Sequence, residues 1–390
     1  MEKTILARTG NEAMAEAMRQ INPDVCAAYP ITPATEIMQI FSGFVSDGLV
    51  KTKLITVESE HSAMSACLGS AAAGARTMTA TSSQGLALMH EILFIVSALR
   101  LPIVLADVNR ALSGPINIHC DHSDTMAERD TGWIQIYAEN SQEAYDLLIQ
   151  AVRIGEHRDV LLPVCVSTDG FIISHGMERL ETYPDAEVQK FVGEYKPVYN
   201  ILDVDNPITV GSLVLTDYYL EHKRAQHEAM KNSLRVMSEV FSEFGKTFGR
   251  TYDFCEKYRC DDAEYILVCL SSTAGTAKAA IEELRNQGMK AGLLKIRAFR
   301  PFPAEQITNT LKNAKAIAVL DRSESLSTRS GPVATEIKAA LYDACVNKPM
   351  QTYIYGLGGR EIYIEDIKKV FNNLKDAKCG GQVEYLGVKE

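Results

Sequence analysis

The sequence has 390 residues, which is too long for one ordinary hydrophobic core, so two domains are expected. Its hydrophobic content of 46% and its charged content of 23% are typical of a globular enzyme or enzyme subunit. A formal net charge of −10 argues against a nucleic-acid-binding surface, which requires clustered lysine and arginine.

The chain shows no signal for export or for a membrane. Its most apolar stretch, 85–108, is interrupted by His90, Glu91 and Arg100, so it lacks the ~18 apolar residues of a membrane span. The segment MEKTILARTG lacks the apolar part of a signal peptide. The nine cysteines are scattered and contain no CxxC pair, so neither a disulfide framework nor an iron–sulfur site is expected. These features predict a cytoplasmic protein that binds no metal itself.

The first half of the chain alternates helical and strand patterns at the spacing of an α/β fold. The helical patterns cover residues 10–21, 35–45 and 60–73. The strand patterns cover 25–29, 54–57, 77–81, 103–108 and 161–167, and they are short, apolar and non-alternating. Strands of this kind are buried on both faces, which predicts a doubly wound parallel sheet.

Residues from about 181 to 262 break this rhythm with prolines and a charged helix expected over 218–244. That helix is interpreted either as a solvated connection or as an arm that contacts another subunit. The α/β rhythm then returns, with strands expected at 265–270, 291–296, 316–320 and 353–356 and helices at 273–286, 303–312 and 333–345. We therefore expect a first α/β domain over 1–180, a linker over 181–262 and a smaller doubly wound domain over 263–390.

Polar residues follow two of the early strands, where ligands gather in an open α/β sheet. In the YPITP sequence at 29–33, two prolines fix the backbone that presents Thr32. Thr32 is expected either to bind an oxygen of a ligand or to cap the next helix. Glu58 and Glu60 lie at the following strand-to-helix turn, where a carboxylate can complement the helix dipole or share a proton with a cofactor. Spacing alone does not choose between the two glutamates.

Two further turns carry candidate groups. Arg110 follows a buried strand, and its guanidinium suits a substrate carboxylate, although an ion pair with Asp121 or Asp124 is equally plausible. Ser83 lies in the turn TSSQG at 81–85, which is expected either to line a pocket or, more simply, to cap its helix.

Several familiar motifs are absent. No GxGxxG follows a strand and no Walker A sequence occurs, and the glycines at 356–359 lack the spacing of a phosphate-binding loop. The chain also lacks the GDG sequence, followed some thirty residues later by Asn-Asn, that binds magnesium diphosphate in thiamine enzymes. The histidines show no metal-binding spacing.

Taken together, these segments resemble the 2-oxoacid:acceptor oxidoreductase family, in particular the alpha chains of multi-subunit pyruvate:ferredoxin oxidoreductases. The matching text is TGNEAMAEAM, AAYPITPATEI, VESEHSAM, TSSQGLALM, NRALSGPINIHCDHSDTMAERDTGWIQIYAEN, KIRAFRPFPAEQI and AVLDRS. It spans almost the whole chain in the expected order, and YPITP combined with the NRALS segment is its most specific part.

The resemblance implies a pyrimidine-type thiamine-diphosphate-binding domain, followed by a domain similar to the C-terminal domain of transketolase. It implies beta, gamma and delta subunits as partners, with the diphosphate, its magnesium ion and [4Fe-4S] clusters held outside this chain. The missing GDG and CxxC patterns agree with that division. Ferredoxin or a similar acceptor would take the electrons, coenzyme A would be a co-substrate, and neither nucleic acid nor membrane is an expected partner.

The resemblance also assigns residues. Glu60 matches the glutamate that hydrogen-bonds the pyrimidine ring of the cofactor, and Thr32 and Arg110 match the positions that hold the oxygens of the substrate. Pro30, Ile31 and Ser83 are expected to contact the cofactor. One departure from the family pattern is the stretch Ser325–Thr328, where many relatives have a glycine-containing Ser-Phe-Gly sequence.

The sequence therefore predicts a subunit that helps convert pyruvate and coenzyme A to acetyl-CoA and carbon dioxide. Pyruvate is favoured because Thr32 beside Arg110 describes a small polar site. Other 2-oxoacids remain alternatives, namely phenylglyoxylate, 2-oxobutyrate and 2-oxoisovalerate. Non-oxidative or lipoamide-dependent thiamine chemistry is a second alternative, and a non-catalytic scaffold subunit is a third.

Overall fold

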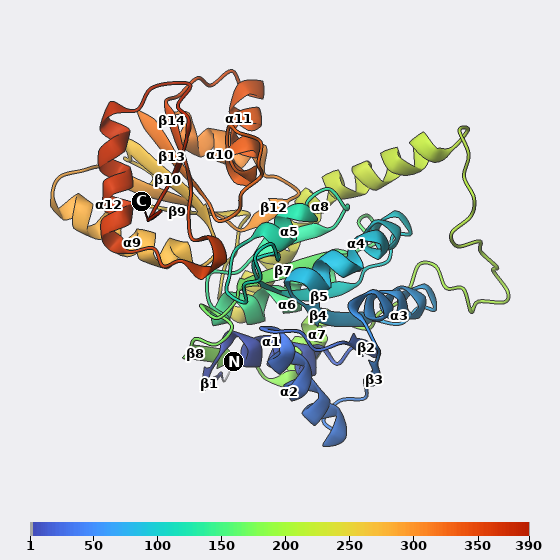
Figure 1. Cartoon of the computed structure of the whole chain (residues 1–390). Coiled ribbons are helices and arrows are strands. Elements are labelled where there is room, and N and C mark those ends of the chain that lie inside the picture. Colours follow the sequence, from blue (N-terminus) through green and yellow to red (C-terminus); the bar gives the residue numbers. More distant parts are fainter. Residues whose placement is uncertain (1–2, 390) are drawn as a thin grey trace.

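The first parallel sheet forms the larger of two α/β domains in the computed structural model, which describes residues 3–389 (Figure 1). The strand order is β12-β6-β7-β5-β4-β2-β3, and only the edge strand β12 is antiparallel to its neighbour. The strands are β2 (Val25–Ala28), β3 (Lys53–Thr56), β4 (Thr77–Thr81), β5 (Val104–Asn109), β6 (Ile134–Tyr137), β7 (Val164–Asp169) and β12 (Ala298–Arg300).

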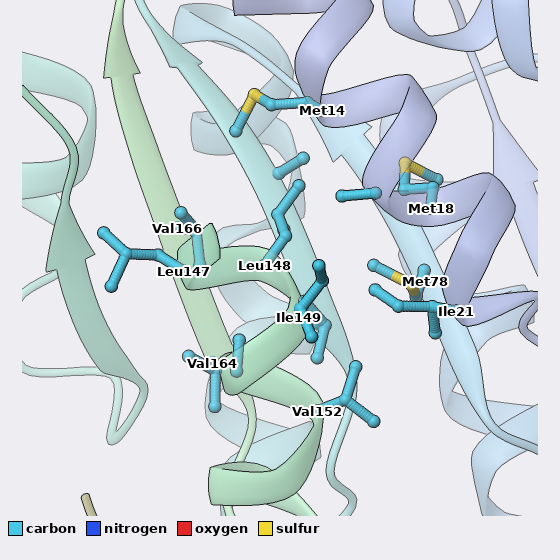
Figure 2. Close-up of a cluster of buried hydrophobic side chains, with 14 of the residues drawn as sticks. Met14, Met18, Ile21, Met78, Leu147, Leu148, Ile149, Val152, Val164 and Val166 are labelled. Atoms are coloured by element: carbon cyan, nitrogen blue, oxygen red, sulfur yellow. The ribbon is translucent and has the colours of Figure 1, made fainter. Parts of the chain in front are cut away.

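Helices cover both faces of this sheet. One face packs against α1 (Gly10–Ile21), α2 (Thr35–Ser46) and α6 (Ser141–Gly155), and the other against α3 (Glu60–Ala72) and α4 (Ser83–Ala98). Figure 2 shows Met14 and Met18 of α1 and Leu148 of α6 in one buried cluster with Met78 and Val164 of the strands. Because both faces are covered, the central strands are apolar without alternation, as the sequence predicted.

The second domain contains a six-stranded sheet in the order β15-β14-β13-β10-β11-β9, in which β9 is antiparallel. Its strands are β9 (Cys255–Tyr258), β10 (Tyr265–Leu270), β11 (Ala291–Ile296), β13 (Ala316–Asp321), β14 (Met350–Ile354) and β15 (Val383–Tyr385). Helices α9 (Thr273–Asn286) and α12 (Ile364–Asn373) cover one face, and α10 (Ala304–Leu311) and α11 (Pro332–Asp343) cover the other. The expected α/β class is confirmed for both domains.

The sequence patterns located many of the helices and strands of both sheets and missed most of the short elements together with the 15-residue helix α6. Helices α1 and α9 and strands β4, β10 and β11 have the predicted bounds. The missed elements are β1 (Thr4–Arg8), which pairs with β8 (Glu178–Thr182), and β6, β9, β12, β15, α5 (Ser123–Ala127), α6, α7 (Asp185–Val192) and α12. The expected strand at 353–356 begins earlier, at Met350, and the one at 161–167 begins later, at Val164.

Helix α8 (Tyr219–Phe248) is exposed to solvent along its first half and partly buried along its second half. Its second half buries apolar side chains against the first domain, including Val236, Val240, Phe241 and Phe244. Its first half and the extended segment before it project away from the body of the chain (Figure 1). The simple interpretation as a solvated linker is therefore wrong for the second half of this helix.

The division at residues 180 and 263 stays a proposal, and the structure refines what lies near those positions. Strand β9 joins the second sheet although it precedes residue 263, and β12 returns from the second domain to pair with β6 of the first. Both are short edge strands whose register depends on partners far away in sequence, so no local pattern marks them.

A buried carboxylate joins the two domains. Asp169, at the end of β7, accepts a hydrogen bond from Arg322 of the second domain at 2.7 Å and pairs with Nε2 of His122, also at 2.7 Å. Ser272 of the second domain donates to the same carboxylate. Burial alone would raise the pKa of Asp169, but the charges of Arg322 and His122 hold it well below its usual range.

The stretch Ser325–Thr328 has two residues in a backbone conformation that glycine adopts more easily than other residues, and many relatives have a glycine in this stretch. Leu326 has φ = 54° and Thr328 has φ = 66°, both in the left-handed region that glycine occupies without strain. The side chain of Leu326 is 84% exposed, so no packing offsets this conformation. The departure from the family pattern therefore falls on a loop that favours glycine.

None of the helices described for residues 3–389 is both long and apolar enough to cross a bilayer.

Replacing Phe244 tests the packing of α8. Phe244 is fully buried among Tyr183, Phe191, Phe248 and Tyr252. Phe244→Ala should lower the free energy of unfolding by about 3–5 kcal/mol, because it removes a buried ring and leaves a cavity. The control Leu220→Ala alters the exposed first half of the same helix and should change stability by less than about 0.5 kcal/mol. Urea denaturation measures both, and equal effects would contradict this description of α8.

Candidate functional site

The candidate residues gather at the carboxyl ends of four neighbouring strands. The spatial order β3-β2-β4-β5 reverses direction between β2 and β4, because the chain first moves outward to β3 and then returns. Ligands of open α/β sheets bind at such a switch point. The loops that follow β2, β3, β4 and β5 carry Thr32, Glu60, Ser83 and Arg110 respectively.

Glu60 is a buried carboxylate at the first position of α3. It is 6% exposed, and no group of residues 3–389 donates a hydrogen bond to its side chain. Glu58 differs in both respects, because it is exposed and accepts a hydrogen bond from the Ser62 hydroxyl at 2.5 Å. That bond lowers the pKa of Glu58. Burial therefore distinguishes two glutamates that spacing could not separate.

Gly85 of α4 provides the space in which the Glu60 side chain lies. A Cβ atom at residue 85 would stand 2.8 Å from Oε1 of Glu60 and 2.4 Å from Oγ1 of Thr81. The Thr81 and Ser82 hydroxyls are also buried and have no hydrogen-bond partner within residues 3–389. Glu60 thus borders a small polar region at the ends of β3 and β4 whose donors and acceptors are not satisfied by the described chain.

Thr32 and Arg110 are in direct contact. Nη1 of Arg110 donates to the backbone oxygen of Thr32 at 3.0 Å, and Nε donates to the backbone oxygen of Asn117 at 2.9 Å. No residue of 3–389 accepts from Nη2, and no carboxylate in this range forms an ion pair with the guanidinium. The alternative of a structural ion pair with Asp121 or Asp124 is therefore wrong.

Thr32 does not cap a helix, contrary to the simpler expectation. The N-cap of α2 is Ala34, which makes no side-chain capping bond, and Thr32 is exposed. Pro30 is also exposed and Ile31 is half-buried, so this loop presents its side chains at the edge of the sheet. Asn11 of α1 supports the loop by donating to the backbone oxygen of Pro33 at 2.9 Å.

The expectation that the turn at 81–85 merely caps its helix is also wrong. The N-cap residue Ser82 makes no capping bond. Ser83 instead donates its hydroxyl to the backbone oxygen of Ala111 at 2.7 Å, and its N–H donates to Asp124 at 3.0 Å. Ser83 therefore ties the start of α4 to the loop that follows β5.

Asp124 holds the two sides of the site together. Its Oδ2 accepts from the backbone N–H groups of Ser83 and Arg110, and its Oδ1 accepts from Asn109 and from the N–H of Thr125, all at 2.8–3.0 Å. Burial raises the pKa of Asp124 to about 6 although these bonds favour the charged form. Sequence reasoning missed this role, since backbone contacts leave no spacing pattern.

Asp107 lies beside Asp124 and shares the amide of Asn109 with it, at 2.9 Å to each carboxylate. Burial, followed by the charge of Asp124, raises the pKa of Asp107 well above its usual value. Oδ1 of Asp107 has no partner, whereas Asp124 accepts four hydrogen bonds. At neutral pH we therefore place the proton of this pair on Asp107 and the charge on Asp124.

Two groups of acidic and metal-binding side chains occur elsewhere in the described residues: Cys120, His122 and Asp169, and Glu139, Glu143 and Glu256. Asp169 is already paired with Arg322 and His122. The three glutamates are paired with Lys295. These carboxylates are thus neutralised by protein cations.

A groove of about 910 Å³ lies away from the candidate residues. It is bordered by the second half of α4, the extended segment before α8 and the first turns of α8. None of Thr32, Glu60, Ser83 and Arg110 lines it. The candidate residues instead lie at the carboxyl ends of β2, β3, β4 and β5.

Solved structures share this fold. A 2-oxoglutarate:ferredoxin oxidoreductase from Magnetococcus marinus, with 2-oxoglutarate, coenzyme A and succinyl-CoA bound, aligns with a TM-score of 0.68 at 19% identity over 96% of this chain. This chain spans 65% of the length of that one. A split-gene transketolase, in an inactive beta4 tetramer, aligns with a TM-score of 0.56 at 10% identity.

Curated relatives match over nearly their full length. The pyruvate synthase subunit PorA of Thermotoga maritima is 56% identical over 393 residues, with all of both chains covered. PorA of Methanocaldococcus jannaschii is 49% identical, with 98% of this chain and 97% of the relative covered. The ketoisovalerate oxidoreductase subunit VorA of Pyrococcus abyssi is 42% identical, with coverage of 98% and 97%.

Two family models match the two halves of the chain. Residues 16–242 match the thiamine-diphosphate-binding domain of pyruvate flavodoxin/ferredoxin oxidoreductase. Residues 263–367 match core domain II of pyruvate:ferredoxin oxidoreductase. Together with the relatives, these matches show that the chain belongs to the pyruvate flavodoxin/ferredoxin oxidoreductase family.

Proposed function

We propose that the chain is one subunit of a 2-oxoacid:ferredoxin oxidoreductase and supplies the pyrimidine side of a thiamine-diphosphate site. The observation that carries this proposal is the buried, unpartnered Glu60 at a switch point of the sheet, in a domain matched by a thiamine-diphosphate-binding family. The proposed reaction joins pyruvate and coenzyme A to give acetyl-CoA and carbon dioxide, with two electrons passing to ferredoxin.

The residues present fit the pyrimidine end of that cofactor. The Glu60 residue is 6% exposed and no group of residues 3–389 donates to its carboxylate, so the carboxylate can share a proton with a ring nitrogen. Gly85 leaves room beside Glu60 that any side chain would fill. The nearby unpartnered Thr81 and Ser82 hydroxyls offer further hydrogen bonds, and Pro30, Ile31 and Ser83 are the other proposed contacts.

When bound, thiamine diphosphate supplies the nucleophilic carbon and the electron sink that decarboxylation of a 2-oxoacid requires. In this proposal, Glu60 holds a proton between its carboxylate and a ring nitrogen. No group of residues 3–389 donates to this carboxylate, and Gly85 leaves the space beside it that the ring nitrogen would need. Glu60 is therefore proposed as the catalytic residue of this chain.

Arg110 and Thr32 are proposed to bind the oxoacid. Two of the donor nitrogens of Arg110 are used by the backbone oxygens of Thr32 and Asn117, which orient the guanidinium plane. Nη2 remains to donate to a carboxylate, and the exposed Thr32 hydroxyl lies on the adjacent loop. This arrangement orients the substrate before carbon dioxide departs, which contributes to the rate through positioning.

Other subunits are proposed to complete the site. The chain lacks the GDG sequence that binds magnesium diphosphate and lacks CxxC pairs. We therefore assign magnesium and the [4Fe-4S] clusters to the beta, gamma and delta subunits of a cytoplasmic complex, with coenzyme A as co-substrate. The first half of α8 remains the proposed subunit-contact arm, and the projecting segment before it exposes further apolar side chains, including Val204, Leu213 and Leu215.

Replacing Glu60 in the assembled complex tests the catalytic proposal. Glu60→Gln keeps the size of the side chain but removes the exchangeable proton, so turnover should fall roughly 10²- to 10⁴-fold with assembly preserved. The matched control is Glu58→Gln, which changes the exposed glutamate two residues earlier and should leave turnover near normal. Near-normal turnover of Glu60→Gln would favour the alternative that the chain is a non-catalytic scaffold.

Replacing Arg110 tests the substrate site separately. Arg110→Ala should lower kcat/KM for the oxoacid roughly 10- to 100-fold, since charge-assisted hydrogen bonds to its carboxylate are lost. The content of bound thiamine diphosphate should stay unchanged. Loss of the cofactor in Arg110→Ala would contradict a role limited to the substrate.

The choice of oxoacid is tested by comparing substrates. We expect the complex to use pyruvate with a higher kcat/KM than 2-oxoisovalerate, 2-oxobutyrate or phenylglyoxylate, because the Thr32 and Arg110 loops describe a small polar site. The PorA relatives favour this choice, whereas VorA shows that a similar chain occurs in a ketoisovalerate enzyme. Ferredoxin reduction is the measured quantity, and preference for a branched acid would reject pyruvate.

A further inference from the structure

The glycine-rich turn at 356–359 lies against the loop that carries Arg110. Gly358 accepts a hydrogen bond from the side chain of Asn117 at 3.0 Å and donates its N–H to Asp121 at 3.1 Å. Gly359 donates its N–H to the backbone oxygen of Cys120 at 2.7 Å. The second domain therefore forms hydrogen bonds with the loop at three positions, 117, 120 and 121.

This contact requires glycine at two positions. Gly358 has φ = 59°, and a Cβ atom there would lie 2.4 Å from Nδ2 of Asn117. Gly359 has φ = 81°, and a Cβ atom there would lie 2.3 Å from Cβ of His119. Both the backbone conformation and the lack of space exclude a side chain. The glycines at 356–359 lack the spacing of a phosphate-binding loop, but Gly358 and Gly359 allow the turn to pack closely against the loop that carries Arg110.

Asn117 links this turn to Arg110. Its backbone oxygen accepts from Nε of Arg110 at 2.9 Å, while its side chain donates to Gly358. The side-chain oxygen accepts from the N–H of His119 at 2.7 Å, so both ends of the amide are held. A shift of Gly358 would move Asn117 and, with it, one of the two hydrogen bonds that orient the guanidinium.

We propose that the Gly356–Gly359 turn of the second domain positions Arg110 through Asn117 and so sets where the carboxylate of the oxoacid binds. Gly358 and Asn117 are positioning residues in this proposal and touch neither substrate nor cofactor. The inference rests on the proposed role of Arg110. It gives the second domain a part in substrate recognition, although all proposed contact residues lie in the first.

The test compares Gly358→Ala in two backgrounds of the assembled complex. In the otherwise unchanged protein it should lower kcat/KM for pyruvate roughly 10- to 100-fold, because a small displacement of an orienting group is costly. In the Arg110→Ala background the same change should alter kcat/KM less than about twofold, because the group through which it acts is gone. Thiamine diphosphate content should be unchanged in all variants.

Gly288→Ala is the matched control. Gly288 lies in the same domain with φ = 88°, but no atom lies within 4 Å of a Cβ placed there. It therefore reproduces the backbone strain without the collision, and its kcat/KM should stay within about twofold of the unchanged protein. Asn117→Ala is a second variant that adds no bulk, and it should lower kcat/KM about tenfold in the unchanged background only.

Equal losses from Gly358→Ala in both backgrounds would overturn the positioning role, since the effect would then not pass through Arg110. Normal kinetics of both Gly358→Ala and Asn117→Ala would overturn it as well. If Arg110→Ala alone left pyruvate kinetics unchanged, the substrate role of Arg110 would fail and the inference with it. That outcome differs from equal losses of kcat/KM in the two backgrounds, which would reject only the proposed link between the second domain and Arg110.

Discussion

The burial of Asp169 is the constraint on which the arrangement of the two domains depends. A carboxylate with no exposure at the end of a central strand is costly unless opposite charges and donors surround it. Arg322 and Ser272 come from the second domain, and His122 comes from the loop after β5. Gly356 allows this pairing, because a Cβ there would stand 2.8 Å from Nε of Arg322. The same contact that neutralises Asp169 therefore places the glycine-rich turn over the loop that carries Arg110.

A second buried carboxylate organises the site itself. Asp124 accepts the N–H groups of Ser83 and Arg110, so the start of α4 and the end of β5 share one anchor. Burial, followed by the charge of Asp124, raises the pKa of Asp107 beside it, while four hydrogen bonds stabilise the charged form of Asp124. Glu60, by contrast, is left without a donor from the described residues. Asp124 is satisfied within the chain, whereas the proposed catalytic acid, Glu60, has its carboxylate available for a ligand.

This difference fits the proposal that the chain holds half of a site. The loops after β2, β3, β4 and β5 converge at one end of the sheet, and the groove along α4 and α8 is lined by none of the four candidate residues. An open edge with a buried acid needs a second surface to exclude water. The family to which the chain belongs, and the absence of a diphosphate-binding sequence, both agree with a partner that supplies this surface.

The sequence by itself determined the α/β class, many of the helices and central strands, and the strand ends that bear Thr32, Glu60, Ser83 and Arg110. These features follow from local periodicity and from the direction of parallel strands, which bring every carboxyl end to one edge. Only the tertiary structure decided that Glu60 rather than Glu58 is buried, that Ser83 bonds to Asp124 instead of capping its helix, and that Gly358 supports Asn117. Those outcomes depend on atoms far apart in the chain that meet only after packing, so no spacing in the sequence records them.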